Sequence, residues 1–259
     1  MRNGNNLQQI FCVIFGETET LIDSHQRDRL AFISGEVSRG YREDGYFPEA
    51  FINMLALLGW NPGTEQEIFS MEELIEAFSL ERVGKSGARF SPDKAHWFNA
   101  QYMHTRCDEE VADIFEAQLK ERGIELSREK VVKIASQIKM RATFPEEFWG
   151  LSSFLFEAPT TYDEKATKKY WKADAPRIIG ELRGILEGIE EFTTAEMERV
   201  VGGWIADNQI GMGLIMNAWR LCIVGEPKGF GMYDMCEVLG KEESLRRIDA
   251  ALAALPKAE

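Results

Sequence analysis

Apolar residues recur at intervals of three and four along most of the chain from Tyr46 onward, which is the spacing of amphipathic helices. Strand-like alternation is nowhere sustained for more than a few residues. The pattern predicts helices over 48–59, 71–78, 92–98, 107–122 and 127–141. After an aromatic stretch at 148–156, it predicts further helices over 164–171, 177–188, 194–207, 211–224, 232–239 and 242–255. The fold class indicated is all-α.

Local signals set several of the helix ends. Pro48 suits the first turn of a helix, and Gly59 suits its end. Ser70 followed by Glu73 forms a capping box at the start of the next helix. The breakers Phe144 and Pro145 interrupt the helical pattern, so we place the boundary between two helical units within residues 123–145.

Charge lowers the expectation of a nucleic-acid partner without excluding one. The chain of 259 residues has 43 acidic and 30 basic side chains, a formal net charge of -13. Net charge governs solubility and long-range repulsion, and a local basic face still holds phosphate groups. The net charge therefore says little about the fold or about the position of a binding site.

The motifs of several enzyme classes and of metal sites are missing from the sequence. Four cysteines and three histidines lie far apart, without the paired spacings of zinc ligands or a disulfide framework. No phosphate-binding glycine loop, dinucleotide-binding turn or nucleophilic-serine elbow occurs. The apolar run from Ile10 to Phe15 is too short to span a membrane and lacks a signal-cleavage pattern. We expect no metal, no catalytic residue, no membrane partner and a cytoplasmic location.

One predicted helix carries a stripe of basic and polar residues. Lys130, Lys133, Gln137 and Arg141 follow one another at steps of three, four and four, so they share a face. Such a line of positive charge suits contact with phosphates, and Arg141 at its end suits contact with a base edge. The alternative is a solvated basic face with no ligand.

A second helix contains an arginine within an apolar sequence. From Met212 to Val224 the only polar side chains are Asn217 and Arg220, so Arg220 needs a partner or lies at the edge of a groove. An internal salt bridge to Asp234 or Glu237 is the alternative. A loop with four glycines or prolines follows, which allows the backbone to approach a ligand closely.

Four segments together resemble the class I glutamyl-tRNA synthetases of bacteria. The segments are Gly40 to Trp60, Phe69 to Phe78, Phe90 to Asn99 and Gly240 to Ile248. The resemblance implies a helical stem-contact domain over 35–125 and a two-part helical-bundle domain over 126–259 that binds the anticodon. It implies tRNA(Glu) as partner, a monomer, and no DNA binding. Unpaired anticodon bases expose edges and faces that duplex RNA hides.

The resemblance also assigns site residues. Arg141 stands where the family has an arginine that senses the first anticodon base, and Arg220 stands where it has the arginine of a Pro-Leu-Arg stretch, here Ala218-Trp219-Arg220. The same resemblance implies that the remaining anticodon bases are enclosed by a loop that includes Gly229, Phe230, Met232 and Tyr233. With the basic stripe of 130–141, this leaves Lys130 and Lys133 as contacts to the tRNA backbone.

The start of the chain departs from the resemblance. The segment before Gly35 is too short for the nucleotide-binding catalytic domain, and Ile22 to Arg27 lacks the lysines of the family's KMSKS-type loop. We interpret residues 1–34 as an altered or truncated segment, partly disordered. Adenylate formation by this chain alone is not expected, and ATP and magnesium enter only with a full-length catalytic domain. The alternative function is a stand-alone helical module that docks proteins, consistent with the acidic net charge.

Overall fold

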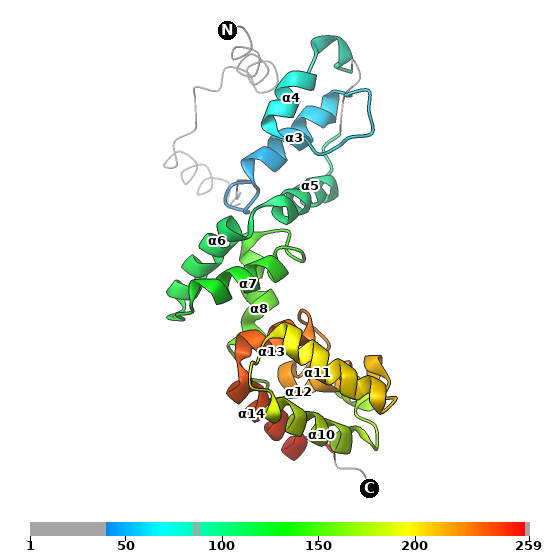
Figure 1. The fold of residues 1–259 in the computed structure, drawn as a ribbon. Coiled ribbons are helices and arrows are strands. Elements are labelled where there is room, and N and C mark those ends of the chain that lie inside the picture. The colour runs from blue at the N-terminus through cyan, green and yellow to red at the C-terminus, as the bar shows by residue number, and fades with distance from the viewer. Residues whose placement is uncertain (1–39, 85–86, 88, 257–259) are drawn as a thin grey trace, which may run out of the picture. The chain divides into compact units, whose positions relative to one another are not determined.

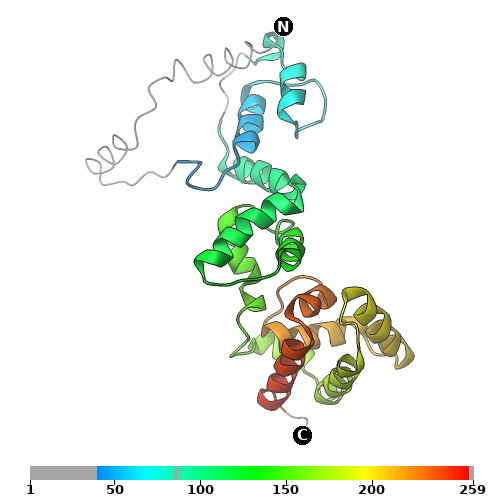
Figure 2. The ribbon, with the colours of Figure 1, turned by 60° about the vertical axis from the view of Figure 1, so that its left-hand side comes forward.

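The computed structural model describes residues 40–84, 87 and 89–256, and Figures 1 and 2 show their helices from two directions. These residues form helices and no named strand, with one isolated antiparallel bridge between Trp60 and Val83. The predicted all-α class is confirmed. The altered start predicted for residues 1–34 lies outside the described part of the chain.

The described residues divide into two compact units. The first runs to Arg106 and includes Ala142–Glu146, and the second comprises Cys107–Arg141 and the described residues from Glu147 onward. The sequence led us to expect the division within residues 123–145, with domains over 35–125 and 126–259. The structure instead groups 107–125 with the second unit, because the helix in that segment packs along the helix that follows it.

In the first unit, the predicted start signals operate as expected. Helix α3 (Pro48–Gly59) begins with a proline in its first turn, and α4 (Met71–Ala77) begins at Ser70, which makes both hydrogen bonds of the capping box with Glu73. The 3₁₀ turn η1 (Leu80–Arg82) and helix α5 (Pro92–Thr105) follow, and α5 is longer than its predicted span.

Two buried asparagines hold the loops of the first unit. The Oδ1 atom of Asn99 accepts a hydrogen bond from the Phe47 amide at 2.8 Å, and its Nδ2 atom donates to the Thr143 carbonyl at 2.6 Å. The Oδ1 atom of Asn53 accepts from the Phe69 amide at 2.9 Å. Around them the apolar core joins Met54 and Phe98 to partly buried aromatic rings. Residues 142–146 therefore belong to this unit through a specific contact.

The second unit begins with an antiparallel helix pair. Helix α6 (Asp108–Glu121) packs along α7 (Arg128–Ile138) through fully buried apolar side chains on both helices. The α7 helix ends three residues before the predicted position, since the amide of Arg141 bonds to the Ile138 carbonyl in a tight turn. The short elements η2 (Pro145–Glu147), α8 (Phe148–Ser152) and η3 (Ser153–Leu155) follow, and Phe148 is buried against Phe115.

Six further helices complete the second unit. They are α9 (Glu164–Tyr170), α10 (Ala175–Gly188), α11 (Thr194–Asp207), α12 (Met212–Val224), α13 (Met232–Leu239) and α14 (Lys241–Ala254). Helix α12 packs against α9, α10 and α14, and α13 packs against α11 and α7. Figure 1 shows α11 and α13 side by side. Helix α12, which has only two polar side chains, thus packs against three other helices of this unit.

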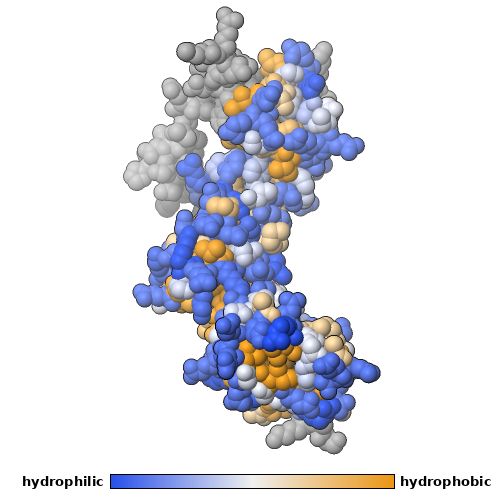
Figure 3. All heavy atoms as spheres, viewed as in Figure 1, coloured by the Kyte–Doolittle hydropathy of each residue, from blue (hydrophilic) through white to orange (hydrophobic). Residues whose placement is uncertain are grey.

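The face of the molecule drawn in Figure 3 is mostly hydrophilic, with small groups of hydrophobic residues between the charged ones. The most exposed large apolar side chains among the described residues are Leu80, Met140 and Met212, from separate elements. Isolated exposures of this kind are normal for a folded chain.

Candidate functional site

Arg220 holds the loop that follows its own helix. From the C-terminal half of α12 its Nη1 atom donates to the carbonyl oxygens of Lys228 at 3.1 Å and Phe230 at 2.8 Å. The side chain is half-buried, and burial together with the positive charge of Arg141 lowers the pKa of its guanidinium. Arg220 thus shapes the loop between Gly225 and Gly231, and the donors not used in these two bonds remain available to a ligand.

Arg141 approaches the same loop from the end of α7. Its guanidinium carbon lies 5.9 Å from the centre of the Phe230 ring, and its Nη1 atom donates to the Gln137 carbonyl at 3.1 Å. The residue is exposed. The structure therefore brings Arg141 and Arg220, which are 79 positions apart in the sequence, to one aromatic residue, Arg141 over its ring and Arg220 at its backbone carbonyl.

Neither of these two arginines is neutralised by a carboxylate among the described residues. Their only hydrogen bonds there run to backbone carbonyls. The alternative in which Arg220 pairs with Asp234 or Glu237 is wrong, because both carboxylates bind Lys133. Two neighbouring positive charges without an acidic partner favour a ligand rich in acceptor atoms, such as a phosphate or the edge of an unpaired base.

Gly229 allows the loop to pass close to the core. Its φ angle is +106°, a conformation that side chains rarely adopt. A Cβ atom there would lie 2.7 Å from the Met235 sulfur and 3.1 Å from Cζ of Phe154. The predicted glycine loop thus has a packing role at this position, in addition to any contact with a ligand.

Two residues predicted as contacts have buried side chains. Phe230 is 2% exposed and its ring packs 5.4 Å from that of Phe154, while Met232 is 4% exposed. Buried side chains of this kind support the loop from below, so direct stacking by Phe230 or Met232 is not available in this conformation. Their predicted role in binding is thereby limited to their backbone atoms.

Tyr233 keeps part of its ring accessible. It makes an edge contact with Trp219 at 5.8 Å between ring centres, and burial together with the charge of Glu198 raises the pKa of its hydroxyl. The hydroxyl therefore stays protonated and is able to donate a hydrogen bond. Of the residues predicted to contact bases, Arg141, Arg220 and Tyr233 are the ones whose side chains reach the surface.

The two lysines predicted to contact the tRNA backbone are both engaged within the protein. The Lys130 ammonium donates to the Val238 carbonyl at 2.8 Å, and the Lys133 ammonium lies 2.7 Å from the Glu237 carboxylate. The basic stripe of 130–141 therefore faces α13 and the loop before it. Its contact with phosphates stays a prediction, which these internal bonds do not support.

Sequence reasoning missed a buried arginine beneath the site. Arg247 of α14 is 2% exposed and donates to the carbonyls of Phe154 at 2.6 Å and Ile223 at 2.9 Å. It also binds the Glu243 carboxylate at 2.6 Å. A usable signal was present, since Arg247 lies at helical spacing from Ser244 and Ala251 and next to Ile248, on the buried face of α14.

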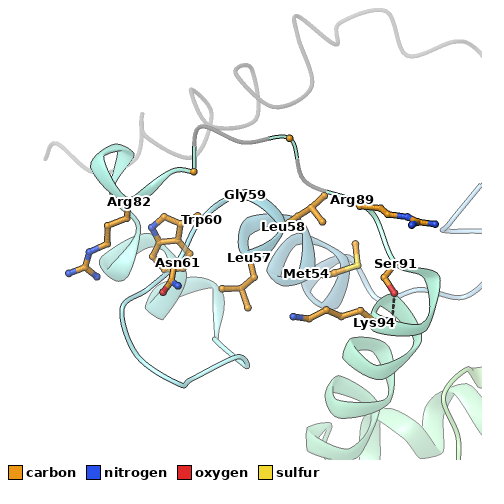
Figure 4. Close-up of a pocket in the computed structure, with 12 residues that line it drawn as sticks. Met54, Leu57, Leu58, Gly59, Trp60, Asn61, Arg82, Arg89, Ser91 and Lys94 are labelled. Atoms are coloured by element: carbon orange, nitrogen blue, oxygen red, sulfur yellow. Dashed lines mark hydrogen bonds between the residues drawn. The ribbon is translucent and has the colours of Figure 1, made fainter.

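A cavity of about 460 Å³ in the first unit is lined by basic and apolar residues of α3, η1 and α5. Figure 4 shows Arg82 and Arg89 pointing away from each other rather than toward a common point. Arg82 donates to the Pro62 carbonyl, and Lys94 pairs with Glu67 at 3.1 Å. These cations do not converge, so the cavity is not built as an anion site.

Two further classes of site have no counterpart in the part of the chain that the structure describes. Its histidines, cysteines and carboxylates form no group of three that could hold a metal ion. None of its helices combines the length and apolar composition needed to cross a membrane.

Two family models match stretches of this chain. The model of the anticodon binding domain matches residues 108–252, and that of the catalytic domain of class I tRNA synthetases (E and Q) matches residues 27–97. The glutamate–tRNA ligase of Bacteroides fragilis is 51% identical over 222 residues, and that of Flavobacterium johnsoniae is 50% identical over 219 residues. These alignments cover 86% and 85% of this chain but only 44% of each relative.

Solved structures give the same result. A glutamate tRNA ligase from Elizabethkingia meningosepticum, determined in complex with its amino acid, superposes with a TM-score of 0.80 at 41% identity. The synthetase from Elizabethkingia anophelis superposes with a TM-score of 0.77 at 41% identity. Each comparison covers 86% of this chain and 44% of the solved chain. The chain therefore spans less than half the length of the relatives it matches.

Proposed function

Because the chain belongs to the anticodon binding domain family, we propose that its second unit binds the anticodon loop of a tRNA, and specifically of tRNA(Glu). Glutamate–tRNA ligases are the relatives that support the choice of tRNA(Glu). The proposed substrate is an unpaired stretch of RNA, whose bases present hydrogen-bonding edges and ring faces.

One observation carries this proposal: Arg141 and Arg220 meet at a single loop with no carboxylate beside them among the described residues. These two positive charges meet at one loop of a chain whose net charge is -13. Arginine is the side chain best suited to paired hydrogen bonds with a guanine edge or with phosphate oxygens. The partly accessible side chain of Tyr233, three residues after Phe230, adds a hydroxyl that donates a hydrogen bond.

The ligase activity of the longer relatives is also part of the proposal. Residues 27–97 match part of the class I catalytic domain model, and the relatives are named as glutamate–tRNA ligases. We infer that the chain supports the attachment of glutamate to tRNA because its second unit binds the anticodon loop. ATP and magnesium would act at the catalytic region of such a ligase, away from the residues assigned here.

The test is a titration of the chain with a tRNA(Glu) transcript and with the same transcript carrying a scrambled anticodon, at two salt concentrations. Tighter binding of the unaltered transcript is the expected result. Equal affinity for the two transcripts would count against anticodon recognition, and recovery of a protein partner without tRNA would favour the docking module instead.

The variants Arg141→Ala and Arg220→Ala distinguish contacts to bases from contacts to phosphates. If the guanidinium groups read bases, each variant weakens binding of the tRNA(Glu) transcript by about 1–3 kcal/mol and reduces the preference over the scrambled one. If they contact phosphates, both transcripts weaken equally and the salt slope falls by about one. Arg177→Ala is the matched control, because Arg177 is exposed on α10 and pairs with Glu181.

A further inference from the structure

Lys133 is the centre of a polar cluster that joins three helices. Its ammonium lies 2.7 Å from Oε2 of Glu237 and 3.7 Å from Oδ1 of Asp234, both on α13. It also donates to Oγ1 of Thr194, the first residue of α11, at 3.1 Å. We call Lys133, Asp234, Glu237 and Thr194 the Lys133 cluster.

The members of the Lys133 cluster also bind one another. The amide of Thr194 donates to Glu237, and its hydroxyl donates to Oδ1 of Asp234 at 3.1 Å. Partial burial acts to raise the pKa of Glu237, but hydrogen bonds from Lys133 and Thr194 outweigh it and lower that pKa. The Glu237 carboxylate is therefore charged at neutral pH. Both carboxylates already have partners, and Lys133 would have to leave several contacts to reach a phosphate.

A second lysine ties the same two helices together one turn away. The Lys130 ammonium donates to the carbonyl of Val238 in the last turn of α13, where carbonyls lack partners within the helix. A positive charge at this end of a helix is also favoured by the helix dipole. Lys130 and Lys133 thus fasten α7 to the C-terminal half of α13, and Lys133 adds a longer contact to Asp234 in the first turn of α13.

Each arginine of the candidate site is connected to one of the fastened helices, since Arg141 follows the end of α7 and Arg220 holds the loop before α13. Lys133 lies in the middle of α7, and Arg141 follows it by eight residues, three beyond the end of that helix. At its other end, α13 begins two residues after Phe230, whose carbonyl holds Arg220. The distance between the two guanidinium groups therefore depends on how α7 sits against α13.

We propose that Lys133 is a positioning residue, which sets the spacing of Arg141 and Arg220 for anticodon recognition through its bonds to α13, rather than a contact to the tRNA backbone. This inference rests on the proposed function. A phosphate contact contributes equally to all tRNAs, whereas the spacing of two base-reading arginines affects the preference for one anticodon over another.

Exchange of the charges of Lys133 and Glu237 distinguishes a positioning residue from a contact to the tRNA backbone. The variants are Lys133→Glu, Glu237→Lys and the double variant that carries both. Binding of the tRNA(Glu) transcript and of its anticodon-scrambled form is measured for each at two salt concentrations. Lys168→Glu is the matched control, because it makes the same charge change on α9 at a side chain that is 81% exposed and has only a 4.0 Å ion pair with Glu164.

If Lys133 positions the arginines, each single variant loses about tenfold of the preference for the unaltered anticodon, since neighbouring charged pairs couple strongly. The double variant then regains most of that preference, while its salt slope stays equal to that of Lys168→Glu. The proposal is overturned if the double variant is no better than Lys133→Glu, or if Lys133→Glu weakens both transcripts equally and lowers the salt slope further than the control does.

Two further measurements keep the result interpretable. If a charge reversal unfolds the second unit, as judged by circular dichroism, Lys133→Gln replaces it, and an unchanged preference in that variant would overturn the proposal. If the unmutated chain shows no preference between the two transcripts, the proposed function itself fails, which is a different outcome from failure of the exchange.

Discussion

Replacement of Arg247 by methionine removes the side chain that caps two helix ends beneath the candidate site. Arg247 donates to the carbonyls of Phe154 and Ile223 at 2.6 and 2.9 Å, and to that of Leu155 at 3.4 Å. Methionine fills much of the same volume without donating a hydrogen bond, so these carbonyls would lose their partner in a region from which water is excluded.

The expected loss of stability follows from the two short bonds. A buried polar group left without its partner costs about 1–3 kcal/mol, so two such carbonyls cost about 2–6 kcal/mol. Glu243 adds little to this sum, because it keeps both of its hydrogen bonds from Arg246. The lost contacts lie in η3, α12 and α14, so the effect should appear in the second unit.

Unfolding in urea, monitored by hydrogen exchange of the backbone amides of α12 and α14, measures this loss of stability within the second unit. With a denaturant slope of about 1–3 kcal/mol/M, a loss of about 3 kcal/mol lowers the midpoint by about 1–3 M. Arg246→Met is the matched control, since Arg246 binds the same Glu243 carboxylate from the exposed side of α14 and its loss should change little. The reasoning is refuted if Arg247→Met and Arg246→Met unfold at the same urea concentration.

Three other predictions concern stability. Gly225→Ala should lower the free energy of unfolding in urea by at least about 2 kcal/mol, because Gly225 has a φ of +82° and an added Cβ would lie 2.6 Å from the Thr161 carbonyl oxygen. Gly184→Ala, at an open position within α10, should instead raise it by about 0.5–1 kcal/mol. Equal effects of the two substitutions would contradict this account. Hydrogen bonds from Arg246 and Arg247, working against partial burial, lower the pKa of Glu243 from 4.5 to about 2. The stabilisation from this carboxylate is therefore complete above pH 4.5 and is lost as the pH falls toward 2, so Glu243→Gln should show a smaller acid-induced loss in a circular dichroism titration. Ser70→Ala should destabilise the first unit by about 1 kcal/mol through loss of the capping box of α4, and unchanged exchange of the first-turn amides would argue against it.

The helices could be predicted because their signals are local. The spacing of apolar residues and the end signals at Pro48, Ser70 and Gly59 depend on neighbours within a few positions, and the predicted ends of α3 and α4 agree with the structure to within one residue. The end of α7 was placed too far along, because the turn at Lys139–Arg141 replaces a helical hydrogen bond with a tighter one that leaves no mark in the apolar pattern.

The candidate site could be predicted only in part. The sequence alone identified Arg141 and Arg220 as arginines that required an explanation, and resemblance to a family placed both at one site. Burial of Phe230 was not predictable, because an aromatic residue in a glycine-rich loop is equally compatible with exposure and with packing on Phe154.

The sequence by itself determined the all-α class, most helix positions and the family, because each depends on short-range spacing or on residue identity along the chain. Only the tertiary structure decided which partners the charged side chains take. Lys130 and Val238 are 108 positions apart, and Lys133 and Thr194 are 61 apart. A stripe of positive charge has the same pattern whether it faces water, RNA or a neighbouring helix, and what lies opposite depends on how the helices pack.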